Sequence, residues 1–134
     1  MPYSRFVDSD GILITTLSGV VTLKEFIQLE YDLTSYIKDG CIYELVIHSD
    51  DVEVLIGKND YNNSSQTLKI VMNELKKGAI AFVSKKDYIF GICRRMQILV
   101  ENELVQINVF RNEETARKWL HEMKSYNSSD SGDI

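Results

Sequence analysis

Hydrophobic positions along the chain recur with two different spacings, and the difference separates predicted strands from predicted helices. Short apolar or alternating runs predict strands at residues 3–7, 11–17, 42–47, 79–83 and 104–110. The run 79–83 is apolar at every position, which is typical of a strand covered on both faces. In the last run Val105, Ile107 and Val109 alternate with polar residues, so their side chains share one face of the sheet.

Apolar residues three and four positions apart predict helices between these strands. The first helix follows a capping box, in which the side chains of Thr22 and Glu25 each bond to the other's backbone N–H, and it extends to about residue 38. Gly40 ends this helix. The second helix begins near 62–65, where Asn and Ser side chains can cap it, and it ends before Gly78.

The third and fourth helices are predicted in the last third of the chain. The third begins at Ser84 or Lys85, and the fourth opens at residues 112–114, where acidic side chains suit the positive end of the helix dipole. Each has an apolar stripe that should face the core: Ile89, Cys93, Met96 and Val100 on the third helix, and Ala116, Trp119, Leu120 and Met123 on the fourth.

Strands that alternate with helices imply crossover connections and a parallel sheet. The turn between the first two strands is too short for a crossover, so these strands should form an antiparallel hairpin. The fold class is therefore α/β: one domain, residues 1–124, with a mixed, mostly parallel five-stranded sheet, an N-terminal β-hairpin and four helices. Residues 125–134 have little to bury and are predicted to be a disordered tail. The long segment 48–63 is partly apolar, so we expect a short extra turn packed over the domain.

Length and charge narrow the class of protein. A chain of 134 residues suits one domain, and 15 Lys plus Arg against 20 Asp plus Glu give a net charge of −5. This charge argues against a nucleic-acid partner, because such binding depends on basic side chains that neutralise phosphates. No apolar run is long enough for a transmembrane segment, and no signal peptide is visible. Cys41 and Cys93 lack metal or redox spacing, so we expect reduced thiols and a cytoplasmic location.

The sequence shows no motif for catalysis or for a cofactor. Phosphate-binding glycine loops, zinc-protease motifs and nucleophile elbows are missing from it. His48, Ser49 and Asp50 are adjacent, and neighbouring side chains on a strand point apart, so they do not form a catalytic triad. The two histidines, His48 and His121, have no partners at metal-binding spacing. We therefore expect a protein that is not an enzyme and has no cofactor and no metal.

Two groups of residues are candidates for binding or regulation. Tyr88, Phe90, Arg94 and Arg95 lie on the third helix, and the Phe90–Arg94 side faces away from the apolar stripe. Phe and Arg are enriched at interfaces, although a lone exposed aromatic residue is also common. Ser64 and Ser65 stand at the start of the second helix, where they can cap it or accept a phosphate.

Several segments of the chain carry a resemblance to a known family. They read AFVS at 81–84, DYIFGI at 87–92, RM at 95–96 and VFRNEE at 109–114, followed by Ala116, Trp119 and Leu120. These segments resemble the SpoIIAA-like family of bacterial proteins, which is similar to STAS domains and to the lipid-binding CRAL-TRIO fold. The match is best over residues 80–120, and residues 11–26 are compatible with it.

The resemblance implies a small module without catalysis. STAS relatives bind protein partners, and some are switched by a phosphoserine in an Asp-x-Ser-Gly motif, which this chain lacks. CRAL-TRIO relatives hold apolar ligands between helices and sheet. The leading hypothesis is a binding or regulatory domain that uses the third helix for an apolar small molecule or a protein partner, including a second copy in a homodimer. The alternative is an anti-anti-sigma-like partner switch that is phosphorylated at Ser64 or Ser65.

Overall fold

The computed structural model describes residues 3–55, 57 and 60–132. The main sheet has five strands in the spatial order β1 (Tyr3–Val7), β2 (Leu13–Leu17), β4 (Cys41–His48), β6 (Lys77–Val83) and β7 (Val105–Phe110). Two short strands, β3 (Val20–Thr22) and β5 (Glu53–Leu55), form a second sheet. The helices are α1 (Leu23–Asp32), the 3-10 helix η1 (Leu33–Tyr36), α2 (Tyr61–Met72), α3 (Asp87–Val100) and α4 (Glu113–Gly132).

The main sheet is mixed because its first connection is a tight turn. β1 is antiparallel to β2, and β2, β4, β6 and β7 are parallel to one another. The Asp8 carboxylate accepts hydrogen bonds from the backbone N–H groups of Asp10 and Ile12, and Gly11 takes a φ of 80°, which favours glycine. The architecture confirms the prediction of a single α/β domain with a mixed five-stranded sheet, an N-terminal hairpin and four helices.

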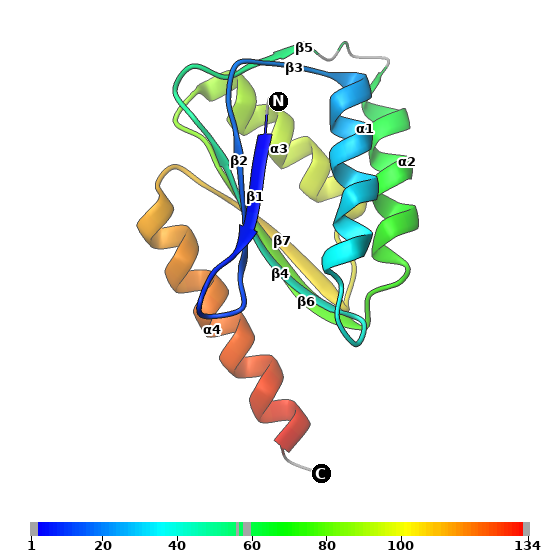
Figure 1. The fold of residues 1–134 in the computed structure, drawn as a ribbon, viewed down its shortest axis with the longest axis vertical. Coiled ribbons are helices and arrows are strands. Elements are labelled where there is room, and N and C mark those ends of the chain that lie inside the picture. The colour runs from blue at the N-terminus through cyan, green and yellow to red at the C-terminus, as the bar shows by residue number, and fades with distance from the viewer. Residues whose placement is uncertain (1–2, 56, 58–59, 133–134) are drawn as a thin grey trace.

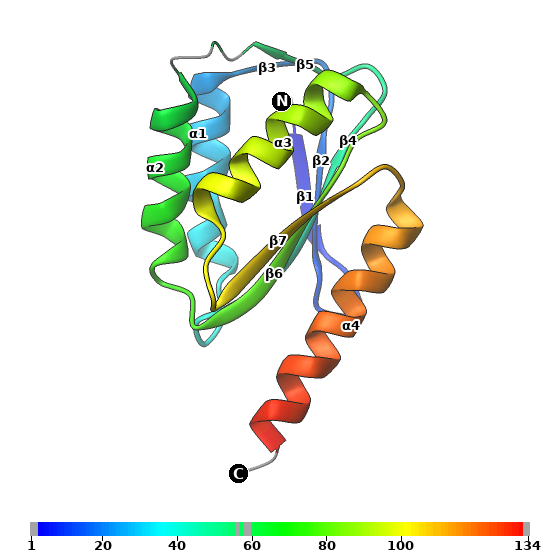
Figure 2. The same ribbon diagram turned by 180° about the vertical axis from the view of Figure 1, so that it is seen from behind.

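Helices cover both faces of the sheet. Figures 1 and 2 show α1, α2 and α3 on one face and α4 on the other, with the C-terminal end of α4 extending past the sheet. Alternate residues of β4 serve the two sides: Ile42 and Val46 pack under α1, α2 and α3, whereas Tyr43 and Leu45 pack against α4. Glu44 stands between Ile42 and Val46 and so faces the three-helix side.

The predicted apolar stripe of α3 is confirmed, since its buried residues are Ile89, Cys93, Met96 and Val100. The capping box of Thr22 and Glu25 is also present at the start of α1. These two features depend on contacts within one helix or on simple periodicity. That is why the sequence alone predicts them.

Three helix boundaries differ from the predictions. α1 ends at Asp32 and continues as η1, where the Thr34 and Ser35 hydroxyls donate to the backbone carbonyls of Tyr31 and Asp32. Such bonds compete with regular helix geometry. α2 ends at Met72, before the predicted end, because the chain from Lys77 already pairs with β4. α3 begins at Asp87, since the Ser84 hydroxyl accepts from the Lys86 N–H and holds a turn there.

The segment 48–63 contains a strand where the sequence pattern predicts only a turn. β5 pairs in parallel with β3, and this pairing satisfies backbone groups of an otherwise irregular segment. Val52 and Val54 are buried, which explains the apolar composition of the segment. Residues 56, 58 and 59 of this segment lie outside the described residues.

The end of the chain also differs from the prediction of a disordered tail over 125–134. In the structure α4 continues to Gly132, and residues 133 and 134 lie outside the described part. The Asn127 side chain donates a hydrogen bond of 2.7 Å to the Tyr43 hydroxyl on β4. This contact gives the last turns of α4 an attachment to the sheet that composition alone does not reveal.

A glycine contact between β4 and β6 gives the first testable prediction. A Cβ atom at Gly78 would lie 2.2 Å from the Ile42 carbonyl oxygen, so the strands must separate to accept any side chain. We expect Gly78→Ala to lower the free energy of unfolding by about 3 kcal/mol, at the upper end for single substitutions. Urea unfolding followed by circular dichroism measures this change.

The control for this prediction is Gly91→Ala on α3. A Cβ atom there meets no other atom within 4 Å, and alanine is the better helix former. We expect this variant to be more stable by about 1 kcal/mol. Equal stability of the two variants would contradict the proposed contact at Gly78.

Candidate functional site

A cavity of about 50 Å³ lies between the main sheet and the helices α1, α2 and α3. Most of its lining is hydrocarbon, and the apolar side chains that line it include Leu29, Leu33, Leu68, Ile80, Ile92 and Met96. A water-sized group needs roughly 10–15 Å³ of such volume, so the cavity holds about three to five of them. The space therefore suits a small molecule rather than a long chain.

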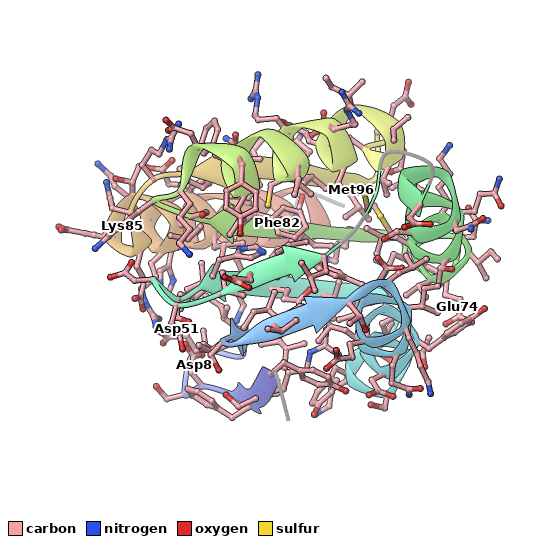
Figure 3. The ribbon with its side chains drawn as sticks, turned by 90° about the horizontal axis from the view of Figure 1, so that it is seen from above. Asp8, Asp51, Glu74, Phe82, Lys85 and Met96 are labelled. Carbon is pink, nitrogen blue, oxygen red and sulfur yellow. The ribbon has the colours of Figure 1, made fainter. Side chains whose placement is uncertain are left out.

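One end of the cavity lies under the small β3–β5 sheet. Val54 of β5 and Phe82 of β6 both line the space. Figure 3 looks down on this end, with β3 and β5 side by side in front and the labelled Phe82 between β5 and α3. The extra strand pair in the long segment 48–63 thus helps to enclose the cavity.

A polar cluster stands on the sheet beside this apolar space. Arg5 of β1 and Glu44 of β4 form an ion pair of 3.1 Å, and only 5% and 4% of their side-chain surfaces are exposed. Thr15 of β2 donates to the Glu44 carboxylate at 2.6 Å and accepts from the Arg5 Nε at 2.9 Å. Arg5 also donates to the Leu29 carbonyl of α1 at 2.8 Å. Three strands and one helix therefore hold the buried Glu44 charge.

A second acidic side chain lines the cavity on the helix side. Glu30 of α1 is 6% exposed, and its Oε1 accepts a hydrogen bond of 2.8 Å from the Ser64 hydroxyl of α2. Its other oxygen, Oε2, is buried without a hydrogen-bond partner among the described residues. Leaving a buried polar atom unpaired destabilises a protein by about 1–3 kcal/mol. The pKa of Glu30 is raised to about 8, mainly by burial. The hydrogen bond from Ser64 lowers it and the nearby Glu44 raises it, and both effects are included in that value.

His48 and Cys93 line the same cavity but are poorly suited to acid–base or nucleophilic chemistry. Burial lowers the pKa of His48 to about 4, so its ring is neutral near pH 7. Its Nδ1 lies 3.1 Å from the Val83 carbonyl oxygen, which only accepts, so Nδ1 carries the proton and Nε2 is left as an acceptor. Burial raises the pKa of the Cys93 thiol to about 12, which keeps it protonated.

The sequence and the structure were compared with those of known proteins. No protein-family model and no curated protein matches the sequence. Among solved structures, the chain is similar to an uncharacterized protein of the DUF3478 family from Shewanella loihica, described as having a SpoIIAA-like fold. The TM-score is 0.55 at 18% sequence identity, over 88% of this chain and 91% of that one. The chain has a SpoIIAA-like fold. The resemblance in residues 80–120 is thereby confirmed at the level of the fold.

The third-helix candidates lie outside the cavity of this SpoIIAA-like domain. Tyr88 is half exposed, with its hydroxyl 3.5 Å from the Val52 carbonyl. Phe90 is half-buried, and the Arg111 guanidinium lies 4.0 Å from its ring centroid. Arg94 is exposed and donates to Gln97, and Arg95 is exposed as well. The structure thus places Tyr88, Arg94 and Arg95 at the outer surface of α3, whereas Phe90 packs partly against the core.

Ser64 and Ser65 lie inside the first turns of α2 rather than on the surface. They are 2% and 4% exposed, and the Ser64 hydroxyl is engaged by Glu30. A phosphate on Ser64 would stand beside a buried carboxyl group, which is an unfavourable place for more negative charge. Of the predicted site residues, only Ser64 lines the cavity.

The sequence pattern did not predict the charged side chains that line the cavity, Arg5, Glu30 and Glu44. Nor did it predict Thr15, which bonds to both Arg5 and Glu44. One signal was available: Glu44 interrupts an otherwise apolar strand, and a charge at such a position is rarely buried without a partner. The partner itself could not be identified, because Arg5 lies 39 positions earlier in the chain.

Other kinds of site find no support in the part of the chain that the structure describes. No group of three His, Cys, Asp or Glu side chains is placed to hold a metal ion there. None of the described helices has the length and hydrophobicity needed to cross a membrane. Cys41 and Cys93 are both free thiols.

Two of the cavity groups with shifted pKa values, Glu30 and His48, should give opposite pH dependences. Folding raises the pKa of Glu30 from its usual 4.5 to about 8, so the folded protein keeps a proton that the unfolded chain has lost. This makes the free energy of unfolding fall as the pH rises from 4.5 to about 8. The pKa of His48 falls from its usual 6.5 to about 4, so its contribution rises with pH only below 6.5. Between pH 6.5 and 8, only Glu30 of these two groups makes the free energy of unfolding depend on pH.

We therefore expect the free energy of unfolding to fall by up to about 2 kcal/mol between pH 6.5 and 8, at about 1.4 kcal/mol per pH unit. In Glu30→Gln this decline should vanish, because the amide does not titrate. The exposed Glu122→Gln on α4 is the matched control and should keep the decline. Urea unfolding at several pH values measures the effect, and an equal slope in Glu30→Gln would refute it.

Proposed function

We propose that this SpoIIAA-like domain is a non-catalytic binding module that takes a small apolar molecule into the cavity between α1, α2, α3 and the sheet. The observation that carries the proposal is the mainly hydrocarbon lining of this partly enclosed space. Closed pockets with few polar groups are the usual form of small-molecule sites. The proposal keeps the ligand-binding hypothesis of the sequence analysis but moves the site to the inner side of α3.

The chemistry of the cavity supports binding rather than catalysis. Nucleophilic catalysis needs an activated nucleophile beside a base. Cys93 keeps its proton because burial raises its thiol pKa to about 12. Arg5 and Glu44 are held by each other and by Thr15, so their charges are already compensated. These groups are better suited to holding the fold and orienting a ligand than to transferring a proton.

The buried position of Ser64 and Ser65 favours ligand binding over the phosphorylation switch. A kinase needs an exposed hydroxyl in an extended segment, whereas both residues stand within α2 and are nearly inaccessible. Phosphorylation would require the first turns of α2 to open. The ligand hypothesis needs only small movements of the side chains that line the cavity.

The experiment uses xenon as an apolar probe, because dry hydrocarbon cavities bind it. Methyl resonances of Leu29, Leu68 and Ile80 should shift as the xenon pressure rises, and those of α4 should not. The variant Val46→Phe, which fills the cavity from β4, should lose these shifts. Native mass spectrometry of freshly purified protein, with mild and then harsh declustering, should release a small bound mass.

The matched control for the filling variant is Val20→Phe. Val20 is 48% exposed on β3, so a larger side chain there projects into solvent. We expect this variant to keep the xenon-induced shifts of the wild type. If the methyl groups that line the cavity show no xenon-induced shifts in the wild-type protein, the proposal is wrong.

A further inference from the structure

The acceptor atoms of the cavity are unequally satisfied. The Glu44 carboxylate is engaged by both Arg5 and Thr15, and Arg5 is further held by the Leu29 carbonyl. Glu30 is different, because Ser64 satisfies only Oε1 and leaves the buried Oε2 without a partner among the described residues. When Glu30 is ionised, a molecule in the cavity that donates a hydrogen bond to Oε2 would complete the arrangement.

The charge of the lining favours a cationic donor. Among the described residues that line the cavity, Arg5 is the only Lys or Arg, whereas two acids, Glu30 and Glu44, line it. His48 adds no positive charge near pH 7, because burial lowers its pKa to about 4. With both acids ionised the lining carries one excess negative charge, which a single ammonium group would neutralise. A carboxylate or phosphate group would instead be repelled by the ionised form of Glu30 and could not pair with it.

We propose that the cavity binds a short primary alkylamine, whose ammonium group donates to Glu30 Oε2 and whose hydrocarbon chain lies among the apolar residues of α1, α2, α3 and the sheet. This inference rests on the proposed function and names its ligand class. The volume of about 50 Å³ accepts about three to five water-sized groups, which corresponds to a chain of a few carbons.

Binding includes a proton exchange that can be balanced explicitly. In the empty cavity Glu30 is a carboxylic acid at neutral pH, because burial raises its pKa to about 8. An entering alkylammonium ion meets this acid, Glu30 releases its proton to solvent, and the ammonium–carboxylate pair remains. The other ionisable or hydroxyl side chains that line the cavity are Glu44 on β4, Arg5 on β1, Ser64 on α2, His48 at the end of β4 and Cys93 on α3. Of these, Arg5 and Glu44 stay paired, so the released proton comes from Glu30.

The first test compares three probes of matched size: n-butylamine, n-butanol and n-pentane. Titrations at pH 7, followed by methyl NMR shifts, should show that n-butylamine binds about tenfold or more tightly than n-butanol, as expected of a hydrogen bond between charged groups. Calorimetry in buffers of different ionisation enthalpy should detect the release of up to one proton. The affinity for n-butylamine should rise with pH up to about 8.

The variant Glu30→Gln removes the charge and keeps the shape of the side chain. It should lose the preference for n-butylamine and the pH dependence while still binding n-pentane and n-butanol. Glu122→Gln on the opposite face of the sheet should behave as the wild type. Retained binding of the neutral probes also shows that Glu30→Gln is folded.

The outcomes separate this inference from the proposed function. One outcome is that n-pentane and n-butanol bind but n-butylamine binds no more tightly; another is that Glu30→Gln keeps the preference for n-butylamine. Either outcome contradicts the inference of an amine ligand and leaves the proposed apolar site unaffected. Such a result is expected if a water molecule satisfies Oε2. If none of the probes binds, the proposed function fails and the inference fails with it.

Discussion

The buried carboxylate of Glu44, in the middle of the sheet, constrains everything built around it. A charge in that position requires a compensating partner, because an uncompensated ion in a protein interior is strongly destabilising. Arg5 supplies the compensation from β1, and Thr15 supplies a hydrogen bond from β2. The same guanidinium reaches the end of α1 through the Leu29 carbonyl. The ion pair thus sets where β1 and α1 stand relative to the sheet, and it lines the cavity between them.

Side chains pack differently on the three-helix side and on the α4 side of the sheet. On the α4 side, small and aliphatic side chains such as Ala81 and Leu120 pack closely, and Phe110 and Trp119 have ring centroids 5.6 Å apart. On the other side, three helices meet the sheet around the polar groups of Arg5, Glu30 and Glu44, and the space between them is not completely filled. A small β3–β5 sheet covers one end of that space. The candidate site thus lies where buried polar groups and incompletely filled apolar space occur together.

The sequence predicts those features that depend on near neighbours in the chain. The buried stripe of α3, the capping box before α1 and the tight turn before β2 follow from spacing and side-chain chemistry, and the structure confirms them. The end of α1 and the start of α3 were missed because single hydroxyl groups redirect the backbone there. The candidate site was missed for a different reason. Glu30 meets Ser64, and Glu44 meets Arg5, across more than 30 positions, and periodicity carries no information about such pairs. The third-helix residues faced the expected way, but the space between helices and sheet opens on their opposite side.

β1 pairs with β2 and has no strand on its other side within the described sheet. Edge strands open more readily than central ones, since half of their backbone groups have no partner in the sheet. Arg5 belongs to this edge strand, whereas the two acids that line the cavity, Glu44 and Glu30, belong to β4 and α1. Each opening of the N-terminal hairpin therefore leaves the cavity more negative for as long as it lasts. The electrostatic potential at the site therefore depends on the local stability of one short hairpin, although other parts of the chain form most of the site.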